Sequence, residues 1–315
     1  MKLTILFGGA SFEHEISIVS AITLKEKLNN FDLSFIFCDG DHKFYLIDSA
    51  KMKATTFSKQ EHKKMPELTL INGAFIQKSM FSTKEHTGVF LNLIHGGDGE
   101  DGVIASLLDF YSIKYIGPRK EACTFSYDKR FTKYLCDAIG VKSVKYEVFH
   151  KNEPKNLSFN FPVIVKPASL GSSIGVSIVK EESEFDYALD TAFEYDSVVL
   201  VEPFIEGVKE YNVAGYMANG KVEFSIVEEP QKEEFLDFEK VYTGLFEGAL
   251  IRCDFFVVDG EVLLNEINPI PGSMANYLFE NFEESLSILA NSLPQTKQVK
   301  VSYDYIHSIS QAKGK

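Results

Sequence analysis

Two strand-like stretches decide the fold, IRCDFFV at residues 251–257 and LLNEINPIPG at residues 263–272. Alternate side chains of a strand share a face, so Asp254 lies beside Arg252, and Glu266 beside Asn268. The carboxylates and the amide offer the hard oxygen ligands that Mg²⁺ takes together with nucleotide phosphates. A surface hairpin with solvated charges is the alternative, but leucines and isoleucines flank the second pair. The stretches therefore predict a metal and phosphate site on antiparallel strands.

A glycine-serine loop lies upstream in VIVKPASLGSSIGVSIV, residues 163–179. Lys166 ends a strand there, and Ser172 and Ser173 follow between two glycines. Backbone N–H and serine O–H groups in such a loop can surround phosphates. It is no Walker loop, because no Gly-Lys-Ser or Gly-Lys-Thr precedes a helix. The lysine and paired serines favour phosphate binding over a plain β-hairpin connection.

Glu202 lies inside an apolar strand within VLVEPFIEGVKEYNV, residues 199–213. A carboxylate in such a strand is costly unless it has a partner. An adenine amino group or a ribose hydroxyl would serve as that partner. A buried salt bridge explains the residue equally well, so the sequence leaves both interpretations open.

Two further motifs follow strands of the N-terminal half, GGASFEHEIS at residues 8–17 and HGGDGEDG at residues 95–102. Glycines before a helix let a ligand approach the backbone, so Glu13 could bind an ammonium group. Taken alone, an acid that complements the helix dipole is the simpler interpretation of Glu13. The second motif has the G-x-G-x-x-G spacing of dinucleotide sites, but its acidic residues would repel a pyrophosphate. We interpret it as a substrate-side loop that presents His95 and carboxylates, among them Glu100.

Composition restricts the class of protein. The 315 residues carry a net charge of -13, which argues against non-specific nucleic-acid binding. No apolar run approaches the roughly 20 residues that span a bilayer, so we expect no membrane association. The four cysteines stand in apolar sequence without metal-site spacing, which fits reduced thiols in the cytoplasm.

Periodicity predicts alternating strands and helices up to residue 120 and mainly antiparallel strands after residue 144. We expect a parallel sheet covered by helices in the first half, and α+β structure in the second. Ile18, Val19 and Ile22 should form the inner stripe of the first helix. Residues 50–67 are polar and lysine-rich, so we interpret them as a surface connection.

Together these motifs, in this order, resemble the D-alanine–D-alanine ligase family of the ATP-grasp superfamily. The resemblance implies an N-terminal α/β domain (1–120), a central ATP-grasp lobe (121–210) and a C-terminal lobe with the metal site (211–315). It also implies ATP-dependent ligation of two D-alanines through an acylphosphate, for peptidoglycan precursor synthesis, and a homodimer. A ligase with another second substrate, such as D-lactate, and an inactive nucleotide-binding protein are the alternatives.

The resemblance also implies residue roles. It assigns catalysis to Glu13, Ser172, Arg252 and Gly272, and substrate binding to His95. It assigns nucleotide binding to Lys129, Lys166, Ser173, Glu202, Phe204, Ile205 and Glu210. It assigns two Mg²⁺, or Mn²⁺, to Asp254, Glu266 and Asn268.

The sequence departs from the family pattern at two places. Tyr277 and Leu278 stand where the family commonly has serine and leucine beside the second substrate. The mobile loop that precedes the RxDF strand in the family is absent, since DFEK at residues 237–240 runs into VYTGLFEGA. We therefore expect a break in the chain between Lys240 and Val241, and a longer polypeptide.

Overall fold

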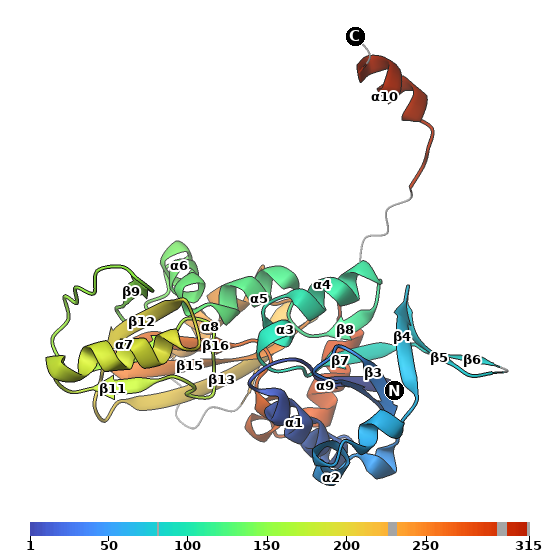
Figure 1. The fold of residues 1–315 in the computed structure, drawn as a ribbon, viewed down its shortest axis with the longest axis horizontal. Helices are drawn as coiled ribbons and strands as arrows, with labels where there is room; N and C mark the ends of the chain where they lie inside the picture. The colour runs from blue at the N-terminus through green and yellow to red at the C-terminus, as the bar shows by residue number, and fades with distance from the viewer. Residues whose placement is uncertain (81, 226–231, 295–300, 314–315) are drawn as a thin grey trace.

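The computed structural model describes residues 1–80, 82–225, 232–294 and 301–313. Within them the chain forms three β-sheets with helices packed against them (Figure 1). The first sheet lies at one end of the long axis, and the two smaller sheets lie at the other. This mixed architecture agrees with the expected ATP-grasp fold class.

The first sheet holds eight strands in the order β6-β5-β4-β3-β2-β1-β7-β8. They are β1 (Lys2–Gly8), β2 (Asp32–Cys38), β3 (Phe44–Ile47), β4 (Glu67–Ile71), β5 (Ala74–Lys78), β6 (Thr83–His86), β7 (Val89–Asn92) and β8 (Lys114–Ile116). The expected parallel part is β2-β1-β7-β8. Antiparallel hairpins extend it from β3 to β6, and the sequence did not predict β4 to β6. Their polar, half-exposed faces hide the alternation on which such a prediction depends.

Helices cover both faces of the first sheet. Leu3, Ile5 and Phe7 pack toward α1 (His14–Lys27) and α9 (Phe282–Asn291), whereas Leu6 packs toward α4 (Val103–Phe110). This is the period-two alternation of a strand that is buried on both faces. The expected inner stripe of α1 is wrong at Val19, which is 58% exposed.

Residues 50–67 are not a plain surface connection. They contain α2 (Ala54–Ser58) and η2 (Glu61–Lys64), and η1 (Ser49–Lys51) overlaps the start of the segment. Phe57 and His62 are buried against the first sheet, where their rings lie beside Phe37. Two buried rings among many lysines were too weak a pattern to predict this packing.

The second sheet has the order β11-β10-β12-β9. Its strands are β9 (Glu147–His150), β10 (Val163–Pro167), β11 (Ser177–Val179) and β12 (Val198–Pro203), and η3 (Glu182–Glu184) and α7 (Phe185–Phe193) lie between the last two in sequence. α5 (Lys120–Tyr127) and α6 (Lys129–Ile139) lead into it. Asp128 caps α6 by accepting from the N–H of Arg130, and Gly140 ends the helix at φ 70°.

The third sheet has the order β14-β13-β15-β16. Its strands are β13 (Lys209–Ala218), β14 (Lys221–Phe224), β15 (Leu250–Val258) and β16 (Glu261–Asn268). The turns Asn219-Gly220 and Asp259-Gly260 both close hairpins with positive φ at each residue. These are the left-handed conformations that asparagine, aspartate and glycine tolerate best.

The expected break between Lys240 and Val241 is wrong for this structure, because α8 (Lys232–Tyr242) runs through both residues. Tyr242 is fully buried, and its hydroxyl donates to the carbonyl of Ala249 at 2.6 Å. The buried ring of Tyr242 makes α8 part of the hydrophobic core of the third sheet. Neither Lys240 nor Tyr242 lines the cavity described below.

The last described helix, α10 (Ile306–Lys313), stands away from the body of the molecule in Figure 1. Across the described ranges, no helix is both long and apolar enough to cross a membrane.

Candidate active site

A cavity of about 590 Å³ is lined by residues from the three sheets and their loops. Most of the predicted site residues line it together: Glu13, His95, Lys129, Lys166, Ser172, Ser173, Glu202, Phe204, Ile205, Glu210, Arg252, Glu266, Asn268 and Gly272. Asp254, Tyr277 and Leu278 do not line it. Motifs separated by up to about 260 residues of sequence thus form one site.

Glu13 lies at one end of the cavity, at the first position before α1. Its carboxylate does not cap the helix; instead Oε1 accepts a hydrogen bond of 2.5 Å from the hydroxyl of Ser172. Ser172 and Ser173 both have left-handed backbones, with φ of 54° and 57°. The strained turn presents the hydroxyl of Ser172 to Glu13, so the helix-dipole interpretation does not account for this carboxylate.

Two glycines leave room for the carboxylate of Glu13. A Cβ at Gly96 would lie 2.6 Å from Oε2, and a Cβ at Gly171 would lie 3.1 Å from Oε1. The first distance is shorter than the contacts that real Cβ atoms make, so a side chain at Gly96 would displace the carboxylate of Glu13. The glycines of both loops therefore belong to the site because of close approach, which the sequence indicated only for residues 8 and 9.

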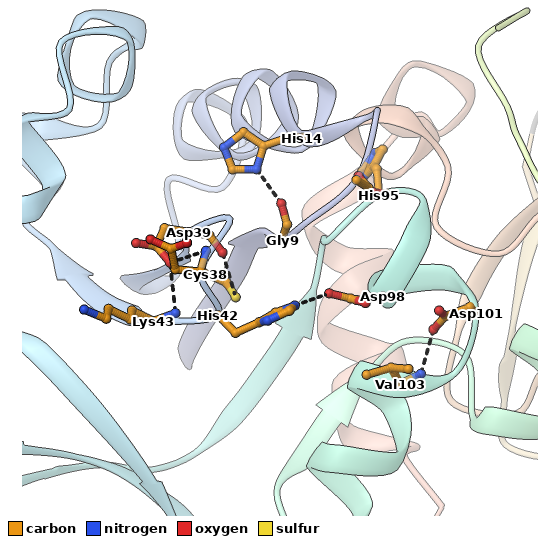
Figure 2. Close-up of polar contacts among 12 residues, drawn as sticks. Gly9, His14, Cys38, Asp39, His42, Lys43, His95, Asp98, Asp101 and Val103 are labelled. Atoms are coloured by element: carbon orange, nitrogen blue, oxygen red, sulfur yellow. Dashed lines mark hydrogen bonds and ion pairs between the residues drawn. The ribbon is translucent and has the colours of Figure 1, made fainter. Parts of the chain in front are cut away.

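A contact between His42 and Asp98 holds the loop that contains Gly96 against the first sheet (Figure 2). His42, in the turn after β2, lies 2.6 Å from Asp98 through Nε2, and Asp101 accepts from the N–H of Val103 at 2.8 Å. His14 donates through Nδ1 to the carbonyl of Gly9 at 2.5 Å. The sequence analysis missed His42, because no spacing connects it with Asp98.

His95 is almost fully buried and uses both ring nitrogens within the protein. Nδ1 donates to the carbonyl of Leu93 at 2.8 Å, and Nε2 lies 3.3 Å from the hydroxyl of Ser20. Burial lowers the pKa of His95 to about 4, so the ring is neutral. Ser20 also accepts from the N–H of Ser273 at 3.0 Å, so His95 helps to hold the turn beside Gly272.

Glu100, one of the carboxylates that the HGGDGEDG loop is expected to present, also lines the cavity. Burial, followed by the charge of Glu13, raises its pKa to about 8. At neutral pH this carboxyl is mostly protonated.

Two lysines, Lys129 and Lys166, make part of the cavity wall cationic. Lys129 donates through Nζ to the carbonyl of Leu170, at the start of the glycine-serine loop. Burial and the neighbouring Lys166 both lower the pKa of Lys129, while Glu266 and Glu202 oppose that shift. Two lysines held close together in a cavity form a site for an anion such as a phosphate chain.

Glu202 forms a buried salt bridge, one of the two interpretations that the sequence left open. Its Oε2 lies 2.6 Å from Nζ of Lys166, and its Oε1 lies 2.8 Å from Nζ of Lys133. Burial alone would raise the pKa of Glu202, but the two lysines outweigh it and lower that pKa. Lys133 was missed, although it lies one turn after Lys129 on α6.

The predicted metal ligands lie across from one another on β15 and β16. Asp254 is paired in register with Glu266, and Arg252 with Asn268. Arg252 binds both oxygens of Asp254 at 2.7 Å, and the amide of Asn268 donates to the same carboxylate at 2.9 Å. Burial raises the pKa of Asp254 to about 7 despite Arg252. Within the described ranges, no three His, Cys, Asp or Glu side chains form a metal cluster, so the candidate set is two carboxylates and one amide.

The two residues that depart from the family pattern have different surroundings. The hydroxyl of Tyr277 lies 3.2 Å from Nη1 of Arg252, at the edge of the cavity. Leu278 instead packs against the hydrophobic core of the first sheet.

Comparison with known proteins identifies the family. The model of the "D-ala D-ala ligase N-terminus" matches residues 2–118, and that of the "D-ala D-ala ligase C-terminus" matches residues 135–251. The chain belongs to the D-alanine–D-alanine ligase family.

Full-length relatives agree with this result. The chain is 65% identical to a D-alanine–D-alanine ligase of Sulfurimonas denitrificans and 54% identical to one of Sulfurovum sp., with all of each protein covered. It resembles the crystal structure of the Helicobacter pylori D-alanine–D-alanine ligase, with a TM-score of 0.87 and 50% identity. That comparison covers 94% of this chain and 100% of the other.

The relatives are longer. Their alignments run over 345 and 346 positions, whereas this chain has 315 residues. The relatives therefore carry residues that this chain lacks, although α8 and β15 are connected here without a gap.

Proposed function

We propose that this chain ligates two molecules of D-alanine at the expense of ATP, releasing ADP and phosphate. The observation that carries the proposal is the charge arrangement of one cavity. Glu13 lines this cavity together with Lys129 and Lys166. An amino acid bound with its ammonium on Glu13 would direct its carboxylate toward a phosphate chain held by the lysines.

In the first step, a carboxylate oxygen of the first D-alanine attacks the γ-phosphorus of ATP. An O–P bond forms, the bond to the β,γ-bridging oxygen breaks, and ADP leaves with that electron pair. No protein nucleophile is required. The chain's task is to hold the two reactants in line and to offset the developing charge.

In the second step, the amine of the second D-alanine attacks the acyl carbon of the acylphosphate. The amine must first lose a proton from its ammonium form. A C–N bond forms, the C–O bond to phosphate breaks, and a second proton leaves the nitrogen. Arg252 and the N–H of Gly272, which line the cavity together, would stabilise the oxyanion that develops between these events.

The donor set at β15 and β16 fits a divalent cation. Asn268 lies within hydrogen-bond reach of both Asp254 and Glu266, and its NH₂ donates to the two carboxylates. Rotation of that amide would present its oxygen instead, which gives the oxygen-rich set that Mg²⁺ prefers. Two Mg²⁺, or Mn²⁺, held there would neutralise charge on the phosphates.

The adenine would lie in the apolar part of the cavity. Phe204 and Ile205, which follow β12, face this space together with Phe256 of β15. Adenine would thus lie between the second and third sheets, with Glu210 placed near the ribose. This division supports the proposed domains 1–120, 121–210 and 211–315.

We also propose a cytoplasmic homodimer. The four cysteines are all free and buried, as in a reducing compartment. Val103 and Phe110 of α4 are 54% and 79% exposed, and such apolar side chains are commonly covered by a second subunit. Light scattering at several concentrations measures the oligomeric state.

Phosphate release from ATP tests the assignment when D-alanine, L-alanine and D-lactate are offered separately and in pairs. We expect release to require Mg²⁺ and D-alanine, with L-alanine inert. Faster release with a D-alanine and D-lactate pair than with D-alanine alone would favour the alternative second substrate. Equal rates with L-alanine and D-alanine would overturn the assignment.

A further inference from the structure

Lys133, Lys166 and Glu202 form a buried triad of charged side chains at the cavity, in which both lysines pair with Glu202. The side chains of Lys133 and Glu202 are 1% and 2% exposed, and that of Lys166 is 10% exposed. Each carboxylate oxygen of Glu202 faces one lysine. Lys166 and Glu202 line the cavity, whereas Lys133 lies behind them on α6 and does not.

The charge balance of this triad depends on Lys133. Two lysines and one glutamate carry a formal net charge of +1, and all three side chains are largely buried. Without Lys133, Lys166 and Glu202 would form a neutral pair at 2.6 Å. Buried charges interact strongly, so the neutral pair would attract a phosphate chain much less than the triad does.

We propose that Lys133 is a positioning residue that keeps the charge of Lys166 available to the phosphates of ATP by sharing the carboxylate of Glu202. This inference rests on the proposed function, because it takes ATP as the ligand. Burial lowers the pKa of Lys133, while the charge of Glu202 at 2.8 Å opposes that shift. The role belongs to the known reaction but falls on a residue outside the cavity wall.

A purely structural role is the competing explanation, because Nζ of Lys133 also donates to the carbonyl of Val144 at 3.1 Å. Val144 lines the cavity. Loss of that bond would disturb the wall whatever the charge on Glu202. A double-mutant cycle separates the two roles, since only the charge role depends on Glu202.

The experiment is calorimetric titration of Mg·ATP into four proteins: wild type, Lys133→Met, Glu202→Gln and the double variant. We expect Lys133→Met to weaken binding about tenfold or more in the wild-type background. In the Glu202→Gln background the same change should cost little, because no carboxylate remains to neutralise Lys166. The KM for D-alanine should stay unchanged throughout.

Lys142→Met is the matched control, since Lys142 pairs with Glu261 at the exposed surface and should leave ATP binding unaltered. Circular dichroism checks folding, and Lys133→Gln replaces the methionine variant if that one does not fold. Equal costs of Lys133→Met in both backgrounds would overturn the charge role. Wild-type protein that fails to bind Mg·ATP would instead refute the proposed function.

Discussion

The hydroxyl of Ser172 donates a 2.5 Å hydrogen bond to Glu13, 159 residues earlier in the chain. This bond joins the start of α1 to the glycine-serine loop of the second sheet. It leaves Oε2 of Glu13 facing the space beside Gly96. Two loops that belong to different sheets thus meet at Glu13.

Glu13→Gln should weaken binding of the first D-alanine and leave ATP affinity unaltered, because only the ammonium contact loses its charge. A hydrogen bond to a charged group contributes about 1.5–3 kcal/mol, so we expect KM to rise by about tenfold or more. Steady-state kinetics with calorimetry of Mg·ATP measures both. Loss of ATP binding with retained D-alanine binding would reverse the placement of Glu13.

Gly96→Ala should raise the KM for D-alanine sharply, because its Cβ would meet the carboxylate of Glu13 at 2.6 Å. The position also has φ +61°, which strains any other residue. Gly73→Ala is the matched control, since Gly73 has φ +77° and open space around it. Similar kinetics for both variants would show that backbone strain, and not the clash, determines the effect.

Glu100→Gln should stabilise the fold at alkaline pH. The pKa of Glu100 is raised from 4.5 to about 8, so the folded state holds this proton more tightly than the unfolded state. As pH rises from 4.5 to 8, the wild type progressively loses stability through this group, and the amide does not. The difference in Tm between variant and wild type should be near zero below pH 4.5 and grow to roughly a few degrees by pH 8. A constant difference across this range would contradict the assigned pKa.

Asp254→Asn and Glu266→Gln should each abolish turnover, because loss of either charge leaves the phosphates under-neutralised. Glu261→Gln, on the same strand as Glu266 but exposed, is the control. Manganese binding followed by electron paramagnetic resonance provides a readout besides activity. Wild-type turnover in either variant would exclude a metal role.

Most of the residues named from the sequence gather in one cavity, although parts of the fold around it were not predicted. Most named residues line one cavity because they occur in short motifs at strand ends, where sheet geometry brings such positions together. Lys133 and His42 were missed because their partners, Glu202 and Asp98, are 69 and 56 residues away and no local pattern connects them. Only tertiary structure supplies that information.

The fold was predicted where apolar periodicity is strong and missed where it is weak. Gly140 and the Asn219-Gly220 turn were readable because few residues adopt positive φ. Residues 50–67 were misread because Phe57 and His62 are buried within a polar segment. The continuous α8 was unexpected because residues 237–240 were interpreted as the start of the family's loop and residues 241–249 as the end of a helix without its beginning, whereas both belong to one segment that is helical up to Tyr242.

The central claim is that a carboxylate of D-alanine is activated by direct attack on ATP. D-alanine labelled with ¹⁸O in its carboxylate tests this claim most directly, with mass spectrometry of both the dipeptide and the released phosphate. The account predicts D-alanyl-D-alanine together with phosphate that carries one ¹⁸O atom from the substrate, since the acyl C–O bond breaks in the second step. Dipeptide formed with unlabelled phosphate, or labelled phosphate without any dipeptide, would contradict it.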